Sequence, residues 1–135
     1  MKPNDIAKIE NELDIELPST YKKLVLNHPF ENEKKFRIAC NVILNDATKI
    51  IDLNNTIRNR GFQNKGWDKS YFIIGHLSMK HFYFINLNDM EKEYIYFLET
   101  SDKFNAKNIS KLIAADSFED LVGNQIDFQN ILNNP

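Results

Sequence analysis

The 135-residue sequence predicts a single α+β domain over residues 1–135, in which helices at both ends flank a largely antiparallel central sheet. Two observations lead to this fold class. Apolar residues recur at helical spacing near both ends of the chain, and β-rich aromatic runs lie between them. Apolar residues make up 42% of the chain and charged residues 27%, which is ordinary for a globular domain.

Two helices are predicted in the first third of the chain. The first covers 4–13 and leads through a short extended link to Pro18, which suits a first helical turn because its missing N–H donor costs nothing there. The second ends before Pro29, since the residue that precedes a proline is disfavoured in helical space. The apolar stripes of the two helices are Ile6, Ile9 and Leu13, and Tyr21, Leu24 and Val25.

The middle of the chain predicts a strand, a short helix and a loop. Every second residue from 36 to 44 is apolar, which is the period of a half-buried strand. A short helix is expected after Asp46, with Ile50, Leu53 and Ile57 on its apolar side. Residues 59–70 form a polar, glycine-containing loop around Trp67.

The last half of the chain predicts most of the sheet and the closing helices. Three β-rich runs are expected over 71–74, 81–87 and 93–98, and a short strand or extended run is expected over 112–115. The second and third form a predicted hairpin, whose aromatic content fits cross-strand packing. A helix is expected to start at Ser117, whose hydroxyl can cap free amides. An acid three residues later, Asp120, makes this pattern similar to a capping box. A separate short helix is expected around Phe128.

Three segments, in this order and spacing, resemble the SUKH superfamily. They are 9–24, with Leu17-Pro18 before Tyr21; 67–75, followed by 83–87; and 113–121, with Ala115-Asp116-Ser117-Phe118. The resemblance implies an α+β fold and a cytoplasmic protein without enzymatic activity that binds and neutralises a cognate toxin domain, because bacterial members are mostly immunity proteins of polymorphic or contact-dependent toxin systems. Eukaryotic members include a regulator of cell-wall assembly, so a regulatory or scaffold module is the alternative.

Charge is distributed unevenly along a chain of net charge −2. Residues 34–80 carry nine bases against three acids, residues 89–102 carry five acids against one base, and four acids and no base follow Leu112. The electric fields of such charged segments affect association with partners rather than the fold. The acids that precede a helix, Asp116, Glu119 and Asp120, are interpreted as complementing the helix dipole.

A partner surface is predicted at the hairpin of the sheet. Acidic residues there would steer a basic toxin domain, although a charged rim that protects a sheet edge is the alternative. Two tyrosines would serve as anchors if no other element covers the second face of the sheet. The predicted partner-binding residues are Asp89, Glu91, Glu93, Tyr94 and Tyr96.

The sequence favours neither an enzyme nor a metalloprotein. His76 and His81 match no metal-binding signature, and Cys40 is interpreted as a buried, inert thiol. No glycine-rich phosphate loop is present, so no cofactor is expected. No apolar run is long enough to span a membrane, no export signal is visible, and a monomer is the default expectation.

A small nucleic-acid-binding protein is the less favoured alternative. Bases interleaved with Phe62 and Trp67 could hold single-stranded nucleic acid if the rings were exposed. The bases are Arg58, Arg60, Lys65 and Lys69. The chain's isoelectric point near 5.9 lies far below the value of about 9 that is typical of such proteins, so nucleic acid is not expected as a partner.

Overall fold

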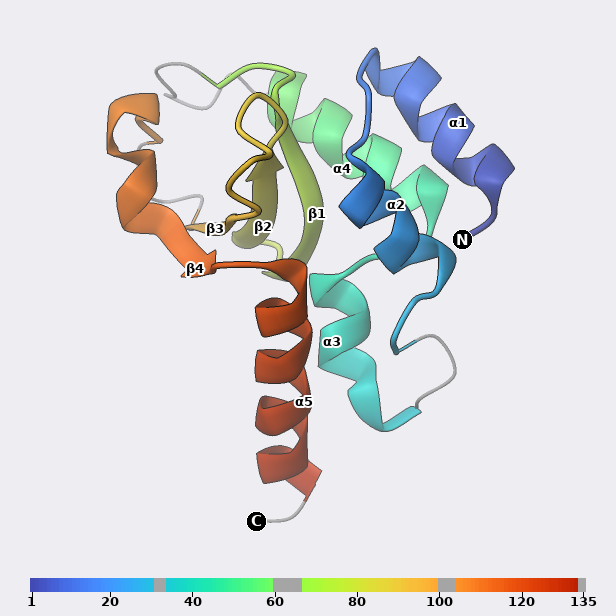
Figure 1. Ribbon diagram of the computed structural model, residues 1–135, viewed down its shortest axis with the longest axis vertical. Coiled ribbons are helices and arrows are strands. Elements are labelled where there is room, and N and C mark those ends of the chain that lie inside the picture. The colour runs from blue at the N-terminus through green and yellow to red at the C-terminus, as the bar shows by residue number, and fades with distance from the viewer. Residues whose placement is uncertain (31–33, 60–66, 100–103, 134–135) are drawn as a thin grey trace.

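The computed structural model describes residues 1–30, 34–59, 67–99 and 104–133 (Figure 1). Its helices are α1 (Pro3–Leu13), α2 (Ser19–Leu26), α3 (Arg37–Val42), α4 (Ala47–Asn59) and α5 (Phe118–Asn133). Two 3-10 helices are η1 (Lys34–Phe36) and η2 (Ala106–Leu112). The strands are β1 (Tyr71–Ser78), β2 (His81–Asn86), β3 (Ile95–Glu99) and β4 (Ile113–Ala115).

The four strands form one antiparallel sheet in the order β1-β2-β3-β4. This confirms the predicted α+β class and the hairpin between β2 and β3. β1 runs four residues further than predicted, to Ser78, and forms a tight hairpin with β2. Because each strand pairs with its neighbour in the sequence, the sheet is built from local connections.

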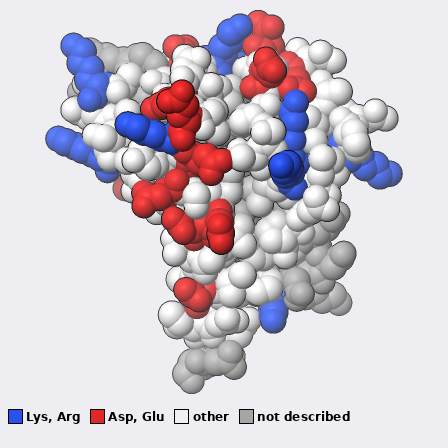
Figure 2. All heavy atoms as spheres, in the orientation of Figure 1, with Lys and Arg blue, Asp and Glu red and all other residues white. Residues whose placement is uncertain are grey.

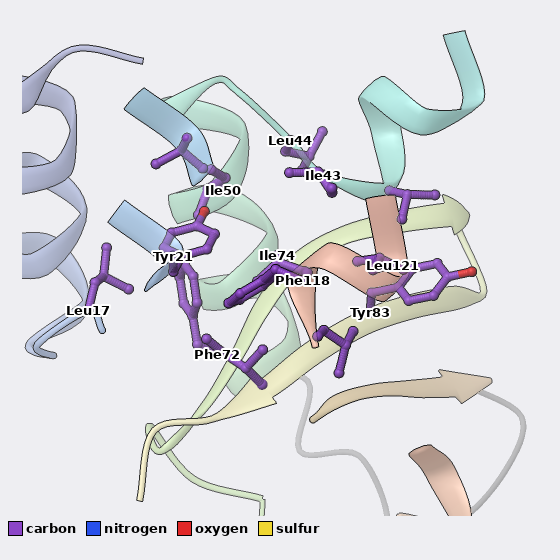
Figure 3. Close-up of a cluster of buried hydrophobic side chains, with 14 of the residues drawn as sticks. Leu17, Tyr21, Ile43, Leu44, Ile50, Phe72, Ile74, Tyr83, Phe118 and Leu121 are labelled. Carbon is purple, nitrogen blue, oxygen red and sulfur yellow. The ribbon is translucent and has the colours of Figure 1, made fainter. Parts of the chain in front are cut away.

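Both faces of the sheet are covered. On one face a large apolar cluster joins the strands to α1–α5, with Tyr21, Phe72 and Phe118 at its centre (Figure 3). On the other face a second cluster holds Phe84 and Phe104, and residues of η2 pack against it. The sequence left open whether this second face was covered, and the structure shows that it is.

The buried amide of Asn54 seals the outer edge of β1. This side chain, 1% exposed, lies on α4 and accepts a hydrogen bond from the N–H of Ile73 at 2.8 Å. Its amide donates to the carbonyl oxygens of Ile73 and Ile50 at 3.0 and 2.9 Å. Asn54 thus satisfies strand groups that would otherwise be unpaired at a sheet edge.

The predicted strand over residues 36–44 is wrong, because this segment forms η1 and α3 and then an extended stretch. The helix buries Ala39 and Val42, three residues apart, against the core. Its carbonyl end also lies directly over Gly75 of β1, where a Cβ atom would overlap the carbonyl oxygens of Asn41 and Val42. Because Gly75 has no side chain, α3 can approach the sheet closely at this position.

The predicted break between two C-terminal helices is also wrong, since α5 is continuous from Phe118 to Asn133. The predicted cap at its start is confirmed, because the Asp120 N–H donates to the Ser117 hydroxyl at 3.1 Å. Figure 1 shows that α5 leads away from the sheet, so that its second half extends past the strands.

One buried hydroxyl in the core makes no hydrogen bond within the described residues. Tyr21 is fully buried, and burial raises the pKa of its phenol well above the ordinary range. An unpaired buried polar group costs about 1–3 kcal/mol. We therefore expect Tyr21→Phe to keep or raise the free energy of unfolding, by up to about 1 kcal/mol, in urea denaturation. A loss above about 1 kcal/mol would show that the hydroxyl has a partner.

Candidate functional site

Acidic side chains from two distant segments form one surface, which we call the acidic band. In the orientation of Figure 1, Asp and Glu gather in a near-continuous stretch from the β2–β3 connection over the start of α5 (Figure 2). Glu93 and Glu119 line one hollow of about 480 Å³, which joins the two segments. The acids that line this hollow or the one beside β4 are Glu93, Asp116, Glu119, Asp120 and Asp127, and we include in the band the exposed Asp89 and Glu91 of the same β2–β3 connection.

The carboxylates of the band have no ion-pair partner among the described residues. The ion pairs of acidic residues that the structure shows are elsewhere, such as Glu10 with Lys22 and Asp14 with Lys69. Lys92, which stands between Glu91 and Glu93 in the sequence, and Lys23, which lines the same hollow as Glu93 and Glu119, form no ion pair with the band. Unpaired like charges on one face produce a negative field that attracts a basic partner.

The acidic residues at the start of α5 have two roles. Glu119 and Asp120 lie in the first turn, where negative charge complements the helix dipole, as the sequence indicated. Asp116, Glu119, Asp120 and Asp127 also line one shallow hollow that faces solvent beside β4. The absence of Lys and Arg after Leu112 marks this segment as acidic in the sequence but does not place it beside the hairpin acids.

The two predicted tyrosine anchors lie on the second face of the sheet. Tyr96 is 4% exposed and stacks on Phe84 with ring centroids 5.3 Å apart, and burial raises the pKa of its phenol. A partner cannot reach this ring without opening the second cluster, so Tyr96 is a core residue. Tyr94 is half-buried and meets Tyr96 edge-on, which leaves part of its ring accessible beside the acidic connection.

One constellation has the residue types of a catalytic triad. The Ser78 hydroxyl lies 2.6 Å from Nδ1 of His81, and Nε2 of His81 lies 3.7 Å from the Glu99 carboxylate. The last distance is too long for a hydrogen bond. The Ser78 hydroxyl also accepts the Lys80 N–H within the tight turn, and His81 stacks flat on Phe97. We therefore assign this group to the turn and the sheet surface.

The bases that could bind nucleic acid, where the structure describes them, contact other groups of the same chain. Arg58 donates to the carbonyl oxygens of Leu13 and Lys69 at 2.9 and 3.4 Å, and Lys69 pairs with Asp14 at 2.7 Å. Trp67 packs edge-on against Phe84 and Phe104 and offers no free stacking platform. Arg60, Phe62 and Lys65 lie outside the described residues.

Titratable residues outside the band have structural explanations. Among the described residues, no three His, Cys, Asp or Glu side chains converge as metal ligands would. The Cys40 thiol, half-buried rather than fully buried as expected, donates to the Phe30 carbonyl oxygen at 3.3 Å, and burial raises its pKa. No helix in the described part of the chain has the length and apolar character needed to cross a bilayer.

His76 should make the stability of the protein depend on pH. Burial and the nearby Lys49 lower the pKa of this imidazole, whose Nδ1 is buried and unpaired within the described residues. The unfolded chain then binds the proton more readily, so stability is lost as pH falls below about 6.5. We expect the wild type to lose more thermal stability than His76→Gln between about pH 7.5 and pH 5.5. Equal slopes would contradict this prediction.

The structure is a small α+β domain. Its most distinctive feature is an exposed, negatively charged face rather than an enclosed cavity. The family model described as SMI1 / KNR4 family (SUKH-1) matches residues 1–124. The chain therefore belongs to the SUKH-1 family, as its three sequence segments indicated. No curated protein matches the chain with significant similarity.

Proposed function

We propose that this protein is an immunity protein that binds a basic toxin domain and neutralises it by covering its active site or substrate channel. Membership of the SUKH-1 family is compatible with such a role. The observation that carries the proposal is the acidic band, in which seven carboxylates lack ion-pair partners among the described residues. Toxin domains that attack nucleic acids need basic surfaces, which such a band would complement.

Occlusion requires a rigid surface rather than a reactive group. A standard interface buries about 800 Å² on each partner, and one face of this domain can supply that area. Complementary charge would raise the rate of encounter and reject wrong partners. On this proposal the protein carries out no reaction, so Ser78→Ala should protect a cell from the toxin as fully as the wild type does.

The direct test of the proposal is co-expression with the toxin domain encoded immediately upstream of this chain. The wild-type protein should restore growth and should form a stable complex with the purified domain. The proposal fails if no toxin is encoded there or if growth is not restored. If a partner other than a toxin binds the same band, the regulatory alternative is favoured.

Reversing charge inside the band should slow complex formation. Glu93 and Glu119 share one hollow, so we expect Glu93→Lys/Glu119→Lys to lower the association rate constant about tenfold or more at low salt. The measurement is stopped-flow or surface plasmon resonance at two salt concentrations.

The matched control for this pair is Glu12→Lys/Asp52→Lys, which makes the same change in net charge at exposed positions on α1 and α4. The control should retain most of the wild-type rate. Equal slowing by both pairs would show that net charge matters and that the band does not.

A further inference from the structure

The second half of α5 presents a concentrated apolar surface to solvent. Ile131 is 69% exposed and Phe128 is 44% exposed, and Ile126 and Leu132 are exposed as well. These residues are four of the eight large exposed hydrophobic residues in the described part of the chain, and they fall within seven positions. Single apolar residues scattered over a surface are ordinary, whereas such a group marks an interaction site.

Three of these residues share one side of the helix. Phe128, Ile131 and Leu132 stand at i, i+3 and i+4, and we call them the α5 ridge. They continue the stripe that starts with the buried Phe118 and Leu121. The stripe therefore begins in the core and ends in solvent, where α5 extends past the sheet (Figure 1).

The ridge lies outside the part of the chain that the family model matches. The family model ends its match at residue 124, and the ridge begins at Phe128. Along α5 beyond that residue, Gln129 is the buried position. Side chains that are exposed, apolar and outside the family match are suited to recognising one particular partner.

The charge beside the ridge indicates what covers it. Asp127 lies four residues before Ile131 and therefore borders the ridge, and Asp120 lies seven residues before Asp127, on the same side of α5 but two turns nearer the sheet. No Lys or Arg occurs in α5. A second copy of this chain seated on the ridge would bring like charges together, whereas a basic partner would be attracted.

We infer that the α5 ridge, with Asp127 beside it, anchors the basic toxin domain. On this inference the toxin domain places an apolar pocket rimmed by Lys or Arg over Phe128 and Ile131. This inference rests on the proposed function and adds the anchor to it. Apolar anchors at the centre of an interface supply most of the affinity, and the surrounding charges supply rate and register.

The test is the affinity of the full chain for the toxin domain encoded immediately upstream. We expect Phe128→Ser/Ile131→Ser to weaken binding about 30-fold or more, the size of a lost hot spot, and to reduce protection of co-expressing cells. Both residues are exposed, so the melting temperature should stay near that of the wild type. The control is Leu77→Ser/Met79→Ser, which removes two exposed apolar residues from the end of β1 and the β1–β2 turn and should leave binding unchanged.

The outcomes separate this inference from the proposed function. If the wild type and the ridge variant bind equally well, the inference is overturned and the proposed function stands. If the wild type does not bind, the proposed function fails and the inference fails with it. Sedimentation of the wild type alone should show a monomer, and a dimer that the ridge variant abolishes would assign the ridge to a second copy instead.

Discussion

Gly75→Ala is expected to destabilise the protein by about 3 kcal/mol or more, enough to leave much of a marginally stable domain unfolded. The added Cβ would overlap the carbonyl oxygens of Asn41 and Val42, which are backbone atoms at the end of α3 and cannot rotate away. To relieve the overlap, α3 must move off β1 and open the core around Val42 and Ile74. Urea denaturation followed by circular dichroism measures the loss.

Gly123→Ala is the matched control for this substitution. Gly123 lies within α5, and a Cβ there would meet no atom within 4 Å. Alanine favours a helix over glycine by about 1 kcal/mol, so this variant should be more stable than the wild type. The account of Gly75 would be contradicted if both variants changed the free energy of unfolding in the same direction by similar amounts.

Asn54→Ala is expected to cost about 3 kcal/mol, because it leaves the buried N–H and C=O of Ile73 without partners. Asn54→Asp should also destabilise the protein at neutral pH. A carboxylate can still accept from the Ile73 N–H, but it cannot donate to the Ile73 and Ile50 carbonyl oxygens and would bury a charge.

Asn55→Ala provides the comparison for Asn54. This neighbour also lies on α4 and is partly exposed, and its side chain makes no hydrogen bond within the described residues. Its replacement should change stability by less than about 0.5 kcal/mol. Chemical denaturation measures the free energy of unfolding of both variants. An equally small change for Asn54→Ala would contradict the claim that this side chain satisfies the edge of β1.

Local pattern predicted most of the fold because most elements are locally encoded. The stripe of Ile6, Ile9 and Leu13 is buried as expected, and the β2–β3 hairpin forms where aromatic runs flank a polar turn. The strand prediction around Ala39 was wrong because a short run in which apolar residues alternate also fits a helix that buries every third residue. The contact that decides between them is with Gly75, which is distant in sequence.

The candidate site was predictable in part for the same reason. The acidic residues of the β2–β3 connection stand close together in the sequence and were found there. These acids lie next to the acids of α5 because that helix begins beside Glu93 in the folded chain. No local sequence pattern contains that information. The sequence left open whether the face that carries Tyr96 was covered, because the cover that η2 and Phe104 provide comes from a later part of the chain.

The most direct test of the central claim is a map of the contact surface in the complex with the toxin domain encoded immediately upstream. Amide chemical shifts of the labelled protein should change over residues 87–94 and from Asp116 through α5 to Leu132. The residues of α1 and the outer side of α4 should stay unperturbed. Shifts centred on α1 and α4, with the acidic band unchanged, would contradict the account.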